Sequence, residues 1–333
     1  MHKPHPNCMR YALAAVLCAA ALLSAVPRAS AQEDEIVANL AGGRVIVHVT
    51  KDAIVFAAIE HPLERKSIPP RFANIDNAHI GILLGAAEWQ VPAQPQPIRL
   101  DRDLERVHVD PRYQRPGEAE VDLEQIGVLF LEKLRPMVAQ LRHKIDLKPD
   151  EPLFSIVLIG YAPRDYGPEV WVIDYRVEQQ SVSASEDYWQ TKILRPRFTQ
   201  LYPPEKHAAH TLIETRFPDD LPDVPLQGLL QQNDPRLARL TSSDARFAKV
   251  AALIDQGQAQ KAASADSADF LRAVLPLIAG NANFVEGVMG ERGGFQWIVP
   301  PTEPVEKRQQ TADDKNRPPE APSLRRPSDL PNR

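Results

Sequence analysis

The chain has 333 residues, of which 43% are hydrophobic and 25% are charged, and its formal net charge is −5. This composition is that of a globular protein with an ordinary acidic surface. It lacks the basic blocks that would indicate nucleic acid or an anionic membrane surface as a partner. The two cysteines, Cys8 and Cys18, both lie close to the start of the chain.

The first 31 residues have the form of a secretory signal peptide. Lys3 and Arg10 precede an apolar run from Tyr11 to Val26, and the small residues 29–31 follow it. We predict cleavage after Ala31, so that Gln32 begins an exported protein, periplasmic or extracellular. A membrane anchor is disfavoured, because a bilayer span takes about 20 apolar residues and this run is shorter.

Cleavage would also remove both cysteines. The mature chain would then have no disulfide, no thiolate metal site and no cysteine nucleophile. We predict a single globular domain over residues 32–299 and a disordered tail over 300–333. The tail is rich in proline and in charges of both signs, so it cannot bury enough apolar surface to offset its conformational entropy.

Strand patterns open the domain. Arg44 to Thr50 and Ala53 to Ile59 are rich in Val and Ile, and Lys51-Asp52 between them fits a tight turn. This pattern predicts a β-hairpin. His79 to Leu84 predicts a short buried strand, whereas the proline-rich residues 91–120 predict a long surface connection.

The clearest helical pattern runs from Asp122, as its N-cap, to Ile145. Its apolar residues fall at spacings of three and four, and Pro136 inside it predicts a kink. A second hairpin is predicted from strands at 153–161 and 169–177.

Further short patterns follow the second hairpin. They predict helices at His207–Thr215, Leu226–Gln232, 248–254 and 270–278, and a last strand at 293–300. Because helices and strands occur in groups, the pattern favours an α+β fold with helix layers over a stacked pair of sheets.

Four stretches carry a distinctive series of strands and glycine turns. They are RVIVHVTKDAIVFAA (44–58), NIDNAHIGILLGAA (74–87), LFSIVLIGYAPRDYGPEVWVIDYRV (153–177) and GGFQWIV (293–299). Together they resemble the N-terminal-nucleophile hydrolases, specifically domains of the proteasome β-subunit type. The resemblance implies a four-layer αββα sandwich. In active members of that family a Thr, Ser or Cys becomes the first residue, and its own α-amine acts as the base.

The nucleophile that the resemblance implies has no match in this chain. Its position falls on Gly43, or on Arg44 with a shift of one residue. Neither residue has a nucleophilic side chain, and Arg44 inside a continuous chain has no free α-amine. Thr50 is the only hydroxyl on the first hairpin, but it lies at the turn. Gln32, exposed by signal cleavage, is not a nucleophile either.

The partners of that nucleophile are also missing. The acidic partner at the end of the second strand would be Ile59, or Glu60 with the same shift. The expected lysine has no match, although Lys66 and Arg71 lie near its place. We therefore predict no catalytic residue.

Other polar residues suggest sites only weakly. His207 and His210, with Glu205 and Glu214 nearby, could share a helix face around a metal ion. Surface or cap histidines explain them better, so no metal site is predicted. The Gly-Gly pairs at 42–43 and 293–294 lack the residues of a phosphate loop, so no cofactor is predicted.

Three more groups have a functional and a structural interpretation. His48 would be a general base or, better, a polar residue on a strand face. Asp174, beside Arg176, would face a cleft or, better, be one half of a cross-strand ion pair. Residues 164–168 would form a binding loop or, better, a turn.

The expected function is therefore a binding or structural role for an exported, non-catalytic protein with a proteasome-like fold. One alternative is an active secreted amidohydrolase or peptidase of that fold with a nucleophile elsewhere. Another is an α+β binding module of a different family. The sequence names no partner. Domains of the proteasome type often assemble into rings, which makes self-assembly an option without a visible interface.

Overall fold

The computed structural model describes residues 36–302, with gaps at 64–66, 76–77, 93, 107–122, 163–166, 183–187, 206–207, 220, 222–224, 233 and 292–293. The predicted signal peptide and its cleavage site at Ala31 and Gln32 lie outside the described residues. So does the predicted tail beyond residue 302.

The first hairpin lies at the centre of an antiparallel sheet, here called sheet B. Its described strands occur in the order β13 (Ile213–Phe217), β2 (Gly43–Val49), β3 (Ala53–Glu60), β14 (Phe284–Gly290) and β15 (Gly294–Val299). Strands β2 and β3 pair from Gly43 opposite Glu60 to Val49 opposite Ile54. The predicted hairpin and its Lys51-Asp52 turn are confirmed.

A second, larger sheet, here called sheet A, contains the second hairpin. Its main path runs β12 (Arg197–Tyr202), β9 (Gly167–Tyr175), β8 (Phe154–Ala162), β6 (His79–Gln90), β1 (Val37–Ala41) and β4 (Ser67–Ile68). Strands β5 (Arg71–Asn74) and β7 (Ile98–Arg99) also pair with β6. Strands β10 (Val177–Ser181) and β11 (Trp189–Ile193) form a separate hairpin.

Six α-helices are described. They are α2 (Leu100–Leu104), α3 (Leu123–Val138), α4 (Leu226–Gln231), α5 (Pro235–Ser243), α6 (Ala245–Asp255) and α7 (Ser264–Ala279). A 3₁₀ turn, η1 (Ala259–Lys261), precedes α7. The protein is therefore a mixed α+β fold with several sheets, as the grouping of sequence patterns predicts.

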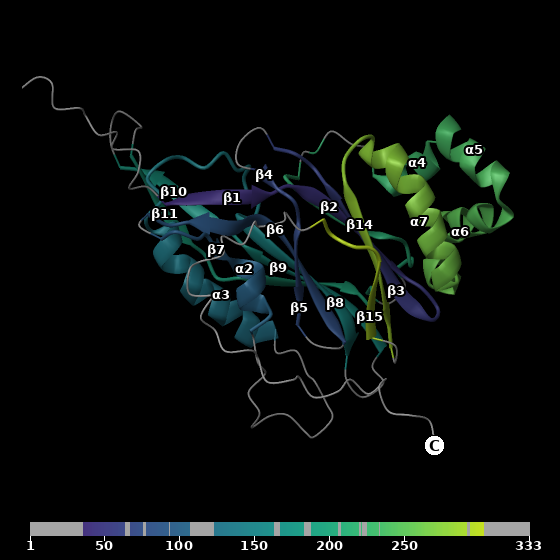
Figure 1. Cartoon of the computed structure of the whole chain (residues 1–333), viewed down its shortest axis with the longest axis horizontal. Coiled ribbons are helices and arrows are strands. Elements are labelled where there is room, and N and C mark those ends of the chain that lie inside the picture. Colours follow the sequence, from purple (N-terminus) through teal and green to yellow (C-terminus); the bar gives the residue numbers. More distant parts are fainter. Residues whose placement is uncertain are drawn as a thin grey trace, which may run out of the picture. The chain divides into compact units, whose positions relative to one another are not determined.

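Three apolar cores hold these elements together. One lies between sheet A and helices α2 and α3, where Phe130 packs against Phe154. The second joins the two sheets and includes Val45 and Ile82, and the third joins sheet B to helices α4–α7 and includes Ile46. Val45 and Ile46 enter different cores because successive side chains of a strand point to opposite faces. Figure 1 shows α2 and α3 on one side of the sheets and α4–α7 on the other.

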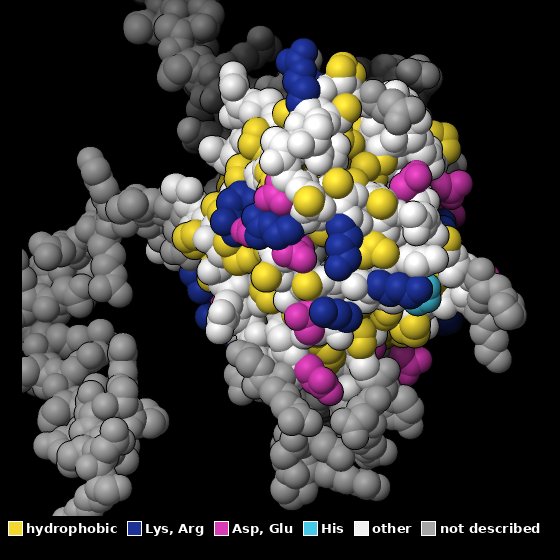
Figure 2. Space-filling model, turned by 90° about the vertical axis from the view of Figure 1, so that its right-hand side faces the viewer, with side chains coloured by type: hydrophobic (Ala, Val, Ile, Leu, Met, Phe, Trp, Pro, Cys, Tyr) yellow, Lys and Arg dark blue, Asp and Glu magenta, His cyan; other side chains and the backbone are white. Residues whose placement is uncertain are grey.

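The outer surface of the α4–α7 layer mixes charges of both signs. Arg246 lies within 2.8 Å of Asp244 and 3.2 Å of Asp269, and Arg272 lies 3.8 Å from Asp269. Figure 2, which faces this layer, shows Lys and Arg side chains beside Asp and Glu. Exposed ion pairs of this kind contribute little to stability.

The long helix is shorter than predicted. Helix α3 ends at Val138, two residues after Pro136, whereas the sequence pattern continues to Ile145. Gln140 and Leu141 donate backbone hydrogen bonds to residues three positions back, which closes the helix with a tight turn. Pro136 itself lies inside α3, and Ala139 after it still donates to the Arg135 carbonyl over 3.0 Å, so the predicted kink stays a prediction. The predicted cap, Asp122, lies outside the described residues.

Two other predictions are wrong. The stretch 91–120 is not only a surface connection, because it contains β7 and α2, and Leu100 and Leu104 of α2 are fully buried. The described part of His207–Thr215 is not helical. Its last residues belong to β13, where Ile213 pairs with Val47 of β2, so pairing with a sheet edge outweighs a weak helical pattern.

None of the described helices is long and apolar enough to cross a membrane.

Candidate functional site

The start of β2 is the position at which the resemblance places a nucleophile. A Cβ atom on Gly43 would lie 2.5 Å from the backbone oxygen of Ile59 and 2.7 Å from Cγ of Pro70. Real Cβ atoms do not approach backbone atoms this closely, so no side chain fits here in this backbone. The chain enters β2 from β1, whose last residue, Ala41, is fully buried.

Arg44, the alternative position, is buried in an ion pair. Its side chain is 2% exposed, and its Nη1 atom lies 3.9 Å from Oε2 of Glu214 on β13. Burial raises the pKa of Glu214, and the attraction of Arg44 offsets part of that shift. The two strands that hold these residues pair side by side, so the guanidinium is fixed in place by the sheet.

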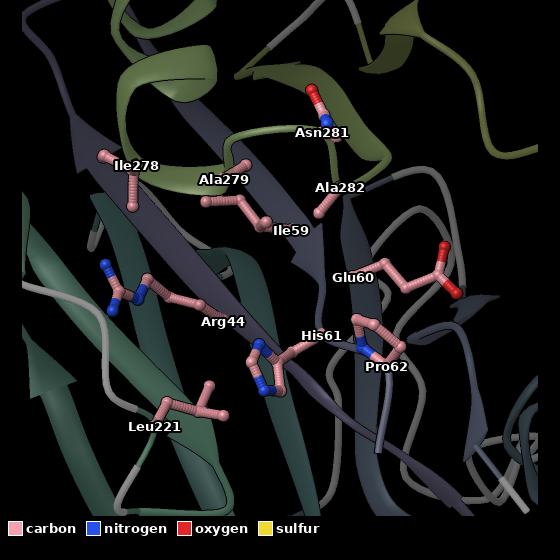
Figure 3. Close-up of a pocket in the computed structure, with 10 residues that line it drawn as sticks. All are labelled: Arg44, Ile59, Glu60, His61, Pro62, Leu221, Ile278, Ala279, Asn281 and Ala282. Atoms are coloured by element: carbon pink, nitrogen blue, oxygen red, sulfur yellow. The ribbon is translucent and has the colours of Figure 1, made fainter. Parts of the chain in front are cut away.

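A cavity of about 370 Å³ lies against Arg44. Its described lining comes from the start of β2, the end of β3 and the two residues after it, Leu221, the end of α7 and the turn that follows α7. The lining residues are Arg44, Ile59, Glu60, His61, Pro62, Leu221, Ile278, Ala279, Asn281 and Ala282. Figure 3 shows the His61 imidazole between Arg44 and Pro62. The volume is near the lower end of small-molecule sites, which are about 300–1,000 Å³.

The described lining of the cavity includes four polar side chains. Its polar side chains are a guanidinium, a carboxylate, an imidazole and an amide, from Arg44, Glu60, His61 and Asn281. Glu60 Oε2 accepts a hydrogen bond of 3.1 Å from Nδ2 of Asn283. Among the described lining residues there is no hydroxyl or thiol.

The other residues considered as parts of a catalytic site have structural partners. Arg71 donates to Glu88 over 2.7 Å, within sheet A. Thr50 Oγ1 donates to the Ala53 carbonyl over 2.6 Å and thereby closes the turn of the first hairpin. Lys66 lies outside the described residues.

His48 is a buried packing residue. Its Nε2 atom lies 2.9 Å from the Ala259 carbonyl, which can only accept, so this nitrogen carries the proton. Nδ1 then accepts from the hydroxyl of Ser267 on α7. Burial lowers the pKa of His48 to about 4, against the effect of the Ala259 hydrogen bond.

Ser267 is a residue that the sequence patterns missed. It is fully buried, as is His48, so the serine–histidine pair has no access for a substrate. Its one sequence signal is a serine in the first turn of an apolar helix, which is common. The pair ties α7 to β2.

No metal site forms in the part of the chain that is described. No group of three or more His, Cys, Asp or Glu side chains is arranged to hold an ion there. His210 packs its ring edge against Tyr202, at a centroid distance of 5.8 Å, and Glu214 faces Arg44. His207 lies outside the described residues.

Asp174 lies opposite Arg197 of the neighbouring strand β12 in the sheet register. Its Oδ1 accepts a hydrogen bond of 2.8 Å from Ser155 on the paired strand β8. Arg176 instead lies 3.4 Å from Asp150. Burial raises the pKa of Asp174, and the Ser155 hydrogen bond opposes that shift. Of the predicted loop 164–168, only Gly167 and Pro168 are described, and they begin β9.

No protein-family model matches this chain, and no curated protein matches it.

Proposed function

We propose that this chain is an exported, non-catalytic binding protein whose domain is an αββα sandwich of the proteasome β-subunit type. The observation that carries the proposal is the start of β2. There Gly43 has no room for a side chain, and Arg44 is buried inside a continuous strand.

The order of the layers supports this fold. Sheets A and B face each other across one core, and each outer face is covered by helices. This is the order that the resemblance implies, whereas a single sheet would have argued against it. The first hairpin also lies in the middle of its sheet, between β13 and β14.

The chemistry supports a binding role. Covalent catalysis of this type needs a hydroxyl or thiol beside a free α-amine. Gly43 and Arg44 supply neither group, while the cavity beside them offers charged, polar and apolar contacts.

An active amidohydrolase of the same fold is the second candidate that the resemblance raises. It would need an accessible nucleophile near this cavity. Ser267 and His48 are joined by a hydrogen bond, but both side chains are fully buried. This burial favours the non-catalytic role.

A β-lactone, which acylates N-terminal hydroxyl nucleophiles, tests the proposal. We expect no covalent adduct on the purified exported protein in intact-mass and peptide-mapping experiments, whereas an active proteasome β-subunit treated in parallel becomes labelled. An adduct that maps to Thr50, and that is lost in the Thr50→Ala variant, would show that the protein is an enzyme.

A further inference from the structure

Strand β15 is the outermost described strand of sheet B, at the end of the sheet away from β13. In the described part of the chain its backbone pairs with β14 alone, and no further backbone hydrogen bond reaches Gly294–Val299. Half of the N–H and C=O groups of an edge strand point away from its neighbour. Such an edge is a template for pairing with another chain.

The sequence of β15 lacks the charges that protect other edges of the two sheets. The opposite edge of sheet B, β13, carries Glu214 and Arg216, and the edge strand β12 of sheet A begins with Arg197. The residues of β15 are GFQWIV, none of which is charged. Charged side chains on an edge discourage association. An uncharged edge can pair with a copy of itself without repulsion between like charges.

Two aromatic side chains of β15 add apolar surface to this edge. Phe295 and Trp297 pack on the core between the two sheets, with their rings edge to face and their centroids 4.5 Å apart. The Trp297 ring also contacts Phe72 on β5 of sheet A, at a centroid distance of 5.2 Å. Both side chains of β15 are only half-buried. A strand added at this edge would therefore cover aromatic surface as well as backbone.

The faces of β15 fix how two copies of it can pair. A two-fold axis perpendicular to the sheet sets the strands antiparallel, and directly opposed residues then lie on the same face. Centred on Gln296, the pairing places Phe295 of each copy opposite Trp297 of the other. The irregularity in the pairing with β14 falls at Ile298, so this centre lies in the regular part of the strand. Parallel pairing would instead bring the two exposed Glu291 side chains together.

We propose that this chain forms a two-fold homodimer in which the β15 strands pair antiparallel about Gln296 and join two copies of sheet B into one continuous sheet. The inference goes beyond the proposed binding function and does not depend on it. An extended segment of a different protein is the competing occupant of such an edge. A sample that contains this chain alone excludes that occupant.

Sedimentation equilibrium of the purified mature chain over a range of concentrations tests the proposal. We expect an equilibrium between monomer and dimer. Gln296→Lys places two like charges directly opposite each other in the dimer and should raise its dissociation constant about fivefold or more. Gln190→Lys, at an exposed position of the separate hairpin strand β11, is the matched control and should leave the constant unchanged. A monomer at every concentration, or a dimer that Gln296→Lys does not weaken, would overturn the proposal.

A single cysteine locates the contact. Residues 32–333 contain no cysteine, so Gln296→Cys gives the mature chain its only thiol. Directly opposed residues of an antiparallel pair have Cβ atoms about 5 Å apart, so mild oxidation should link the chains into a covalent dimer. Gln190→Cys should give little of it. Circular dichroism shows whether each variant is folded, and equal cross-linking of the two folded variants would contradict the inference.

Discussion

In the core under the helices, burial shifts the pKa values of acidic and basic side chains in opposite directions. Burial lowers the pKa of His48 to about 4 and raises the pKa values of Glu214 and Glu286. In each case burial disfavours the charged form, because a low-dielectric interior solvates charge poorly. His48 is therefore neutral in the folded protein at neutral pH, as its acceptor role toward Ser267 requires.

The shift of His48 predicts a loss of stability in acid. The folded state takes up a proton on His48 near pH 4, and the unfolded chain near 6.5. The stabilisation is fully present above pH 6.5 and falls toward pH 4, by about 3 kcal/mol in all. Urea unfolding at a series of pH values should show this decrease, and His48→Gln should flatten it.

Glu214 and Glu286 are present in both proteins, so their contributions cancel and the difference between the wild type and His48→Gln isolates the histidine. Ser267→Ala serves as the control. It should lower stability by about 1 kcal/mol at all pH values and keep the acid dependence, since His48 stays buried. An equally steep acid loss in His48→Gln would mean that another group causes it.

The elements that sequence patterns predicted best are those with strong local signals. The first hairpin has alternating Val and Ile around Lys51-Asp52, and both the turn and the register follow from that pattern. β13 was missed because its pairing with β2 is a contact between distant parts of the chain. The end of α3 at Val138 was missed because the apolar spacing continues past Pro136 as a turn that still buries Leu141.

The crowding around Gly43 at the start of β2 predicts that a larger residue there destabilises the protein. Gly43→Ala would bring Cβ within 2.5 Å of a backbone oxygen, and backbone cannot move without disturbing two paired strands. We expect a loss of about 1–3 kcal/mol in urea unfolding, the usual cost of overpacking a core.

Gly127→Ala is the matched control. Its Cβ would also lie 2.5 Å from its nearest neighbour, but that atom is Cζ of Phe198, the end of a side chain that is 37% exposed. The ring can turn aside, and alanine favours the helix by up to about 1 kcal/mol. This variant should be neutral or stabilised. Equal destabilisation of both variants would contradict the account of Gly43.

At the scale of the whole molecule, sequence patterns could not predict the cavity. Its walls come from segments far apart in the chain, around Arg44, Glu60, Leu221 and 278–282. Each segment alone is an ordinary strand end or helix end. Only the packing of α7 against sheet B, through the core under the helices, brings them together.

The place of Arg44 at the start of a strand, in contrast, could be predicted from the sequence. The alignment of the Lys51-Asp52 turn places Gly43 and Arg44 at the start of the strand, and both residues begin β2. What the sequence could not provide is the reason that no side chain fits at Gly43, which is the backbone oxygen of Ile59. The strand that leads into this position, β1, is part of sheet A, so a cut here would break the chain between the two sheets.

The N-terminus of the mature protein tests the central claim most directly, because an active nucleophile of this type must be the first residue. Intact-mass measurement of the exported protein should give a chain that begins at Gln32 and continues through β1 into β2. A chain that begins at Gly43, Arg44 or Thr50 would contradict the account.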